Sequence, residues 1–481
     1  MPNGFDLAGA ARQEMIDHGF EPEFPPDAER QLAGIHASDG HGLRDLSNLL
    51  WSSIDNDDSR DLDQIEWAGR VDGGVRVLVG IADVDSAVAK GTPIDTHAAQ
   101  ETTTVYTGIR TFPMLPEKLS TDLTSLAESQ NRAGVVIEFV VAKDGSIGAN
   151  AIYRALLRNH AQLTYSAVGA WLEGSAPPPP KVAACADLEA QLKLQDEAAQ
   201  ALRAERHRLG ALTFDRQEVQ AVVEDGKVRS IEARRSNQAA HLIEDFMIAA
   251  NEVMARTLKA AGVSSIQRVV KAPERWPRMV ELARGLGEKL PPDPDPGALN
   301  AFLVRRQQAD PVHYPDLSLA VLKLMGPGEY VLSRPGDQGQ GHFGLAAQDY
   351  THSTAPNRRF ADLVTQRLLK SLQNGAAAPY ADAELGAIAR NCTLKEDAAR
   401  KVQRDMNKRI AAVALEPRIG QTFSGVVTGV TPKGVFVRVL DPPVEGRVMR
   451  GEEGLDVGDR VRVKLLGADP RRGFIDFGRM E

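Results

Sequence analysis

The sequence predicts an α+β fold, in which a domain of mixed sheet and helices is preceded by a short helical module and followed by an all-β barrel. Three patterns lead to this prediction. Apolar residues recur at helical spacing over 237–259, apolar runs typical of buried strands lie at 73–83 and 135–141, and the residues after Arg418 alternate between apolar and polar. Because a domain usually contains about 100–200 residues, a chain of 481 residues holds more than one. We place the domains at 1–38, 39–415 and 416–481.

Two short helices are predicted near the start of the chain, over Leu7–His18 and Ala28–His36. The prolines of the segment Glu21–Pro26 prevent one continuous helix, because proline lacks the amide hydrogen that a helix interior needs. Residues 1–38 are therefore expected to form either a helix-turn-helix-like module or a plain helical cap.

A short loop holds a cluster of closely spaced aspartates, namely Asp55, Asp57, Asp58, Asp61 and Asp63. Unpaired carboxylates at this spacing repel one another, which raises their pKa values and costs folding energy. A hard cation such as Mg²⁺ removes the repulsion, because it prefers oxygen ligands and is commonly held by one or two carboxylates together with substrate phosphate. The alternative is a solvated acidic turn. The apolar strand that follows at 73–83 favours the metal site, because it attaches the loop to a core element.

The chain after this loop alternates between turns, strands and helices. Lys90–Asp95 is expected to form a turn, and Tyr106 by itself is typical of a half-buried strand aromatic. Helices are predicted over Ala184–Arg208 and over 237–259, and the apolar face of the second is assigned to packing.

A pair of arginines, Arg358 and Arg359, follows Pro356 at the expected start of a helix. Guanidinium groups beside the N-terminal amides of a helix suit a phosphate group. An isolated Arg-Arg pair is more often an ordinary surface feature. Only folding can bring these arginines to the carboxylate loop, which makes their proximity a geometric prediction.

The last part of the chain is expected to be a basic helix followed by a small barrel. The helix spans 382–412 and carries Arg400, Arg404 and Lys408 on what is otherwise a charged exposed face. Five short strands separated by turns then predict the barrel.

The acidic loop resembles the catalytic signature of the ribonuclease II/R (RNB) family of 3′→5′ exoribonucleases. The match consists of Ile54-Asp55, a five-residue gap and Asp61-Leu62-Asp63. Gln64 takes the place of the family's fourth acidic residue. Its amide oxygen can ligate a metal but brings no charge and cannot act as a base, so that the site is open to one cation or two. The resemblance covers nearly everything after residue 40, and residues 1–38 are too short for the pair of cold-shock domains that usually precedes the catalytic domain.

Other positions extend the resemblance. Tyr106 falls on a tyrosine that stacks on a base near the RNA 3′ end, and Arg358 falls on an arginine that grips the phosphate. Gln403 occupies the place of a catalytically relevant glutamate, whose role is not carried over. The C-terminal barrel is similar to an S1-type OB fold, in which Lys433 replaces a stacking aromatic.

The resemblance implies a Mg²⁺-dependent, processive 3′→5′ exoribonuclease, with Mn²⁺ as the alternative cofactor. Its substrate would be single-stranded RNA with a free 3′ end, hydrolysed to nucleoside 5′-monophosphates in RNA decay or 3′-end processing. The implied catalytic residues are Asp61, Asp63 and Arg358. The implied metal ligands are Asp55, Asp61, Asp63 and Gln64. The implied RNA-binding residues are Tyr106, Arg358, Arg359, Lys433, Phe436 and Arg438.

Two other functional classes stay open. Gln64 and Gln403 are consistent with a catalytically impaired RNA-binding protein of the same fold, which would bind RNA without metal-dependent turnover. The aspartates alone would also suit a metal-dependent phosphatase for small substrates, although that function leaves the barrel unexplained.

Composition limits the cellular setting. The net charge of −8 argues against indiscriminate nucleic-acid binding over the whole surface. Cys185 and Cys392 lie too far apart for a zinc motif or a disulfide framework. The start of the chain shows no signal-peptide pattern, and no apolar run reaches the roughly 18 residues that a membrane span needs. We therefore expect a cytoplasmic protein with no membrane segment, and a monomer by default.

Overall fold

The structure is a computed structural model that describes residues 5–38, 40–214, 217–224, 227–311 and 313–480. Its helices are α1 (Leu7–Asp17), α2 (Pro26–Leu32), α3 (Pro93–Glu101), α4 (Tyr165–Leu172), α5 (Pro180–Ala183), α6 (Ala186–Arg208), α7 (Gln238–Ala260), α8 (Trp276–Gly285), α9 (Pro296–Ala309), α10 (Tyr314–Met325), α11 (Phe360–Gln373) and α12 (Asp382–Leu415). The predicted domain boundary at residue 39 lies outside the described residues.

The strands of the main domain are β1 (Arg44–Asp45), β2 (Trp51–Asp55), β3 (Gln64–Val71), β4 (Gly74–Ala82), β5 (Val105–Tyr106), β6 (Thr111–Phe112), β7 (Asn131–Ala142), β8 (Ile147–Thr164), β9 (Gln217–Glu224), β10 (Lys227–Arg235), β11 (Ser265–Val269) and β12 (Glu329–Ser333). Those of the C-terminal barrel are β13 (Thr422–Thr431), β14 (Gly434–Val439), β15 (Glu445–Arg450), β16 (Arg460–Asp469) and β17 (Phe474–Arg479). This arrangement confirms the predicted fold class.

A mixed sheet forms the centre of the main domain. Its strand order is β1-β8-β2-β3-β4-β7, and β8 also pairs with β7. Strands β8, β2, β3, β4 and β7 therefore form a closed circuit, to which β1 is attached through β8. The long β8 makes this circuit because its first part is antiparallel to β7 and its last part is parallel to β2. β2 also pairs with β3 in antiparallel fashion, with Ser52 opposite Glu66. The acidic loop between β2 and β3 therefore has both ends held by central strands.

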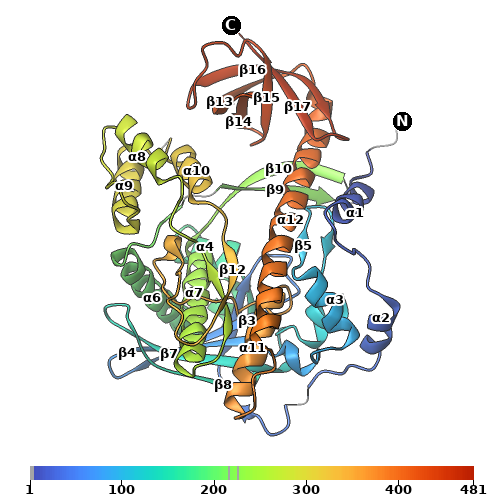
Figure 1. Ribbon diagram of the computed structural model, residues 1–481, viewed down its shortest axis with the longest axis vertical. Coiled ribbons are helices and arrows are strands. Elements are labelled where there is room, and N and C mark those ends of the chain that lie inside the picture. Colours follow the sequence, from blue (N-terminus) through green and yellow to red (C-terminus); the bar gives the residue numbers. More distant parts are fainter. Residues whose placement is uncertain (1–4, 39, 215–216, 225–226, 312, 481) are drawn as a thin grey trace.

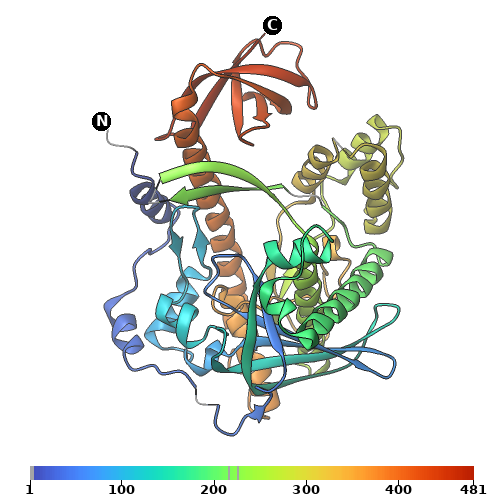
Figure 2. The ribbon, with the colours of Figure 1, turned by 180° about the vertical axis from the view of Figure 1, so that it is seen from behind.

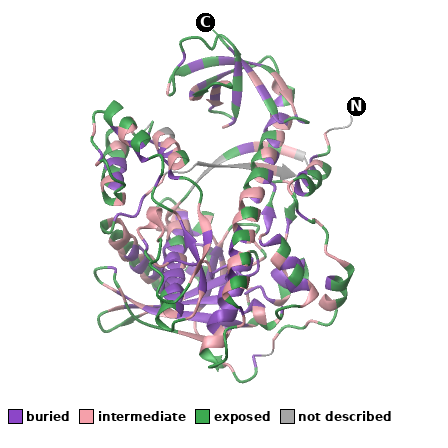
Figure 3. Cartoon of the chain, in the orientation of Figure 1, coloured by how far each residue is buried: buried purple, intermediate pink, exposed green. Residues whose placement is uncertain are grey.

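Helices α6 and α7 pack on this sheet and on each other. The N-cap of α7 is Asn237, whose side chain accepts a hydrogen bond from the Ala240 amide at 3.0 Å. The apolar face of α7, including Leu242 and Phe246, joins the main core. Buried residues concentrate where the sheet, α7 and α11 meet (Figure 3). The predicted packing role of this helix is confirmed.

Helix α12 connects the main domain to the barrel (Figure 1). Helix α1 packs against the side of α12 through Leu7, Ala11 and Met15. The closed barrel, ordered β13-β14-β15-β17-β16, follows at the end of α12 and has its own apolar core. Seen from behind, the β9–β10 hairpin crosses α12 below the barrel (Figure 2).

Helices α8, α9 and α10 form a separate small unit with its own core around Trp276 and Phe302. The proline-rich segment before α9 helps to close this core, because the Trp276 indole donates to the Pro291 carbonyl at 2.9 Å. The unit lies on the opposite side of the molecule from α1 (Figure 1).

The expected turn at Lys90–Asp95 is wrong in its second half, because Pro93 begins α3. Proline suits the first turn of a helix, where the missing amide hydrogen would have no partner in any case. Within the described ranges, no helix combines the length and the apolar character needed to cross a bilayer.

Candidate active site

Asp63 lies at the centre of the site. It ends the acidic loop directly before β3, and only 1% of its surface is exposed. Its Oδ1 accepts a hydrogen bond from the Asn357 amide at 3.0 Å, and the Arg358 Nε lies 3.3 Å from its Oδ2. Folding therefore brings together the acidic loop and the arginine segment, as the sequence predicted, although 295 residues separate Asp63 from Arg358.

The arginine segment is held in place from behind. Asp362, fully buried in the first turn of α11, accepts from the Ala355 amide at 2.8 Å and from the Arg359 side chain at 2.8 Å. Thr124 donates to the Asn357 Oδ1 at 2.6 Å. Sequence reasoning missed the role of Asn357, although this residue stands between Pro356 and the two arginines.

Arg358 and Arg359 differ in what they face. The side chain of Arg358 is 45% exposed, so that it reaches both Asp63 and solvent. The side chain of Arg359 is three-quarters buried and pairs with Asp362, while its buried Nε has no hydrogen-bond partner among the residues that the structure describes. Arg358 is thus placed to contact a ligand at Asp63, and a contact between Arg359 and RNA stays a prediction.

Tyr106 and Asp61 form a second pair beside Asp63. The Tyr106 ring, at the end of β5, is 41% exposed, and its hydroxyl donates to the Asp61 Oδ2 at 3.4 Å. Burial raises the pKa of Asp61, and the negative charge of Asp55 raises it further. Burial also raises the pKa of Asp63 to about 7, because the opposing effect of Arg358 is smaller. Burial thus disfavours the charged forms of Asp61 and Asp63, and a bound cation would stabilise those charged forms.

Asp55 and Gln64 complete the predicted set. The Asp55 Oδ1 accepts from the Asn56 amide at 2.8 Å and from the Ser59 hydroxyl at 2.7 Å, which folds the loop back on itself. Gln64 is buried as the first residue of β3, directly after Asp63. The four predicted metal ligands therefore lie on the two ends of one loop.

Glu66, which sequence reasoning missed, is a further carboxylate near this loop. It is fully buried on β3, and within the described part of the chain neither of its carboxylate oxygens has a hydrogen-bond partner. Burial, with a contribution from Asp55, raises its pKa well above the ordinary value. A glutamate in a strand with alternating polarity is easily taken for a solvent-facing residue. Its position two residues after Gln64 was the available signal.

The chemistry of these residues fits a hard divalent cation. They offer carboxylate and amide oxygens, which are the donors that Mg²⁺ and Mn²⁺ prefer. The buried Asp63 and the unpartnered oxygens of Glu66 are groups that a cation would stabilise. Asp55, Asp61 and Asp63 do not bring one oxygen each within 4.8 Å of the others. Each of them is instead bound to a donor of its own, so that metal binding requires local rearrangement.

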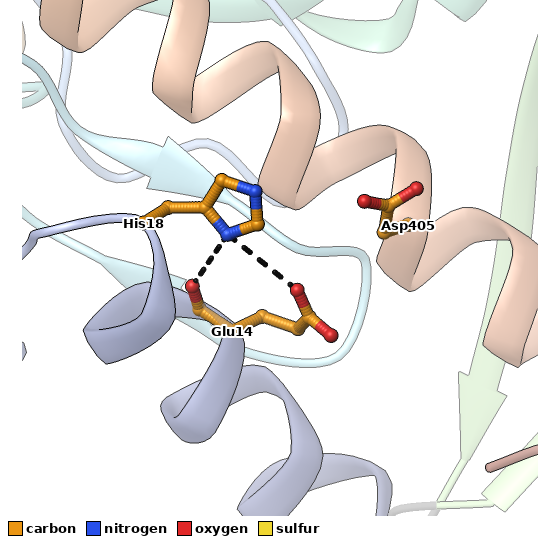
Figure 4. A group of neighbouring side chains, drawn as sticks. All are labelled: Glu14, His18 and Asp405. Carbon is orange, nitrogen blue, oxygen red and sulfur yellow. Dashed lines mark hydrogen bonds and ion pairs between the residues drawn. The ribbon is translucent and has the colours of Figure 1, made fainter. Parts of the chain in front are cut away.

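In the part of the chain that the structure describes, the trio with ligand atoms within 4.8 Å of one another is Glu14, His18 and Asp405 (Figure 4). Glu14 and His18 lie on or next to α1, and Asp405 lies on α12. Arg409 already pairs with Glu14, and Lys408 pairs with Asp405 at 3.2 Å. We interpret this group as part of the polar contact that holds α1 against α12.

A cavity of about 930 Å³ lies between α12, α10 and the barrel. Lys433, Phe436 and Arg438, the three barrel residues predicted to bind RNA, line it, and Gln403 lines it from α12. Its other basic lining residues are Lys323, Arg400, Arg404, Lys408 and Arg447. The exposed Phe474 adds a second aromatic ring. Cations combined with aromatic rings are typical of surfaces that bind single-stranded nucleic acid.

Comparison with known protein families gives two matches. The model of the RNB domain matches residues 43–375. The model of the RNase II-type exonuclease C-terminal S1 domain matches residues 421–480, which contain the closed barrel.

Individual relatives agree with these matches. Ribonuclease R 1 of Lactococcus lactis is 29% identical over 98% of this chain and 61% of its own length. Ribonuclease R of Aquifex aeolicus is 29% identical over 91% of this chain and 65% of its own length. This chain therefore spans less than two thirds of either relative. A solved structure of Mycoplasma genitalium RNase R in complex with ribose methylated single-stranded RNA has a TM-score of 0.87, with 23% identity over 99% of this chain and 78% of that one.

Proposed function

This chain belongs to the RNB family, and we propose that it is a Mg²⁺-dependent, processive 3′→5′ exoribonuclease. It would hydrolyse single-stranded RNA from a free 3′ end and release nucleoside 5′-monophosphates, with Mn²⁺ as the alternative cofactor. The observation that carries this proposal is the pairing of the buried Asp63 with the exposed Arg358, next to Tyr106 and Asp61. The ribonucleases R among the relatives support the same activity.

Asp55, Asp61, Asp63 and Gln64 would hold the divalent cation. When bound, the cation supplies Lewis acidity toward the phosphate and makes water nucleophilic at neutral pH. The Asn357 amide keeps the Asp63 carboxylate oriented, because it binds one oxygen and leaves the other facing Arg358. The donors behind this segment keep its geometry fixed before substrate arrives.

Arg358 would bind the scissile phosphate. Its Nε faces Asp63, which leaves the two terminal nitrogens of the guanidinium for phosphate oxygens. Because these donors are already in place, they would stabilise the negative charge that develops on the phosphate in the transition state.

Tyr106 would stack on a base near the 3′ end. Its ring is exposed while its hydroxyl is anchored to Asp61, so that the aromatic face is presented at a fixed position beside the carboxylates. Base stacking on aromatic rings tolerates any sequence, as a degradative enzyme requires.

The cavity below the barrel would bind the upstream part of the RNA strand. Its lysines and arginines, with Lys433 and Arg438 among them, would contact the phosphates, and Phe436 would stack on a base. Arg359 is proposed as an additional phosphate contact. We place the enzyme in RNA decay or 3′-end processing in the cytoplasm, as a monomer.

The test is a time course on 5′-labelled single-stranded RNA with Mg²⁺, with a chelator, and with the variant Asp63→Asn. We expect the label to pass from full-length RNA to short end products with few intermediates, as a processive enzyme gives, and we expect this conversion to disappear with the chelator and in the variant. The released products are identified by chromatography as nucleoside 5′-monophosphates. A label that is removed at once, or internal cleavage products that persist, would contradict digestion from the 3′ end.

The second candidate is a catalytically impaired RNA-binding protein. Gln64 favours it, because an amide brings no charge to the metal site. It predicts that RNA binds and that the label stays intact at every Mg²⁺ or Mn²⁺ concentration.

A further inference from the structure

At the β2–β3 pair, three buried polar atoms have no hydrogen-bond partner among the residues that the structure describes. They are the two carboxylate oxygens of Glu66 and the hydroxyl of Ser52. Ser52 and Glu66 lie directly opposite each other in the antiparallel pair, and both are fully buried. Side chains of opposite residues in such a pair lie on the same face of the sheet, so that the three atoms share one small polar site.

This arrangement is costly unless something binds there. An ionised carboxylate in a protein interior without a counter-charge costs several kcal/mol. A protonated carboxylic acid avoids the charge but still leaves buried donors and acceptors unpaired, at about 1–3 kcal/mol each. The great majority of buried polar groups in native proteins are paired, and each exception needs an explanation such as a bound ion, an ordered water or a catalytic role.

The neighbours of Glu66 identify the missing partner as a cation. Glu66 follows Gln64 on the same face of β3, because alternate residues of a strand point to the same side. The charge of Asp55 acts on Glu66, and Tyr165 is under the influence of both carboxylates. Asp55 is the charged group that acts on Glu66, and it is negative, so a hard divalent ion would satisfy the unpaired oxygens where no positive side chain does so among the described residues.

We propose that Glu66 supplies the negative charge that Gln64 lacks, and that it binds a divalent cation together with Asp55. The proposal rests on the proposed metal-dependent function and deepens it. The acidic set of the site would then be Asp55, Asp61, Asp63 and Glu66, with the fourth carboxylate moved two residues along β3. Gln64 contributes a neutral oxygen at most. The chain thereby keeps four carboxylates for its cations in spite of the glutamine.

The test measures metal binding directly, on the full chain and without RNA. Mn²⁺ is titrated into metal-free wild type, Glu66→Gln, Gln64→Asp and the double variant Gln64→Asp/Glu66→Gln, and free Mn²⁺ is followed by electron paramagnetic resonance. The melting temperature of each protein is recorded with chelator and with saturating Mn²⁺. Glu252→Gln is the matched control, because Glu252 is a buried glutamate on α7 that pairs with Arg256.

Glu66→Gln is expected to lose at least one Mn²⁺ equivalent or to weaken its binding by about tenfold or more, since even the loss of a group that only supports the metal ligands typically costs about 10–100-fold in metal affinity. Its melting temperature with chelator should stay close to that of the wild type, since an amide of nearly the same size replaces a carboxyl group whose neutral form burial favours. Its gain in melting temperature with Mn²⁺ should be smaller. Adding Asp at position 64 should restore Mn²⁺ binding, and the control should behave as the wild type.

Three results would overturn the inference. One is unchanged Mn²⁺ binding in Glu66→Gln, which would mean that water or protonation satisfies the carboxyl group. Another is an equal loss of stability with and without Mn²⁺, which would mean a purely structural role. The third is the absence of any Mn²⁺ binding by the wild type. The RNA time course separates this inference from the proposed function, because chelator-sensitive digestion by the wild type stands even if Glu66 binds no metal.

Discussion

Replacing Arg358 tests the active-site geometry most directly. Its Nε is committed to Asp63 at 3.3 Å, and among the described residues no hydrogen bond engages its two terminal nitrogens, so that they can bind a phosphate. At about 1.5 kcal/mol for each charge-assisted hydrogen bond, two such bonds contribute about 3 kcal/mol to the transition state. Because each 1.4 kcal/mol corresponds to a factor of ten, Arg358→Ala should lower kcat/KM by about 150-fold. Arg358→Lys retains one donor to the phosphate and should lose about tenfold.

The assay is the initial rate of shortening of 5′-labelled RNA at saturating Mg²⁺. Melting temperature serves as the check on folding, and it should change little because the side chain is half exposed. The matched control is Arg305→Ala, which removes a similarly exposed arginine that pairs with Glu288 on the small helical unit. If Arg358→Ala stays within about threefold of the wild type, or if lysine restores full activity, the fork geometry is not what the reaction uses.

Three further predictions follow from features away from Asp63. Phe436→Ala should weaken RNA binding by about 1–3 kcal/mol at every salt concentration, because it removes base stacking. Lys433→Ala should instead lower the slope of log affinity against log salt by about 0.7, because it removes one phosphate contact. Anisotropy titrations across KCl concentrations separate the two effects, and equal salt slopes for the two variants would contradict the assignment. Burial lowers the pKa of His342 to about 4. Between about pH 6.5 and 4, His342 therefore binds a proton in the unfolded chain but not in the folded chain. The free energy of unfolding should then fall by up to about 1.4 kcal/mol per pH unit as the pH drops through this range. His342→Asn should flatten this slope in urea denaturation, and a parallel slope would refute the link. Arg367 is buried in ion pairs with Asp85 and Asp95 at 2.9 and 2.7 Å, so Arg367→Met should cost about 3–5 kcal/mol of stability, and a loss below about 1 kcal/mol in the same assay would show that the network is dispensable.

Long periodic segments were predictable from the sequence, and broken ones were not. The helix predicted over 237–259 forms α7 almost residue for residue, because its apolar stripe matches the face that the sheet buries. Helices α8, α9 and α10 were not predicted. Each is short, each begins near a proline, and they bury their apolar residues against one another rather than against the main core. The local sequence pattern does not show which helices pack against one another.

The candidate site shows the same limit. Asp63 and Arg358 carried recognisable surroundings, so their meeting was predictable. Glu66 was not, because the strand pattern does not reveal that β3 lies between β2 and β4 with covered faces. A charge inside that arrangement is visible only once strand order is known. The contribution of the Asn357 amide also depends on tertiary geometry, since a backbone donor has no sequence signature.

The single helix α12 makes the placement of the barrel sensitive to its length. It continues for 34 residues without a break and joins the barrel directly at its end. Because an α-helix turns about 100° and advances about 1.5 Å per residue, inserting one residue midway would swing the barrel a quarter turn or more around the helix axis. Inserting about seven would restore its azimuth and raise it by about 10 Å. The length of α12 therefore sets both the distance and the rotational orientation of the barrel. We expect insertions in α12 to preserve that orientation only when they add about whole helical turns.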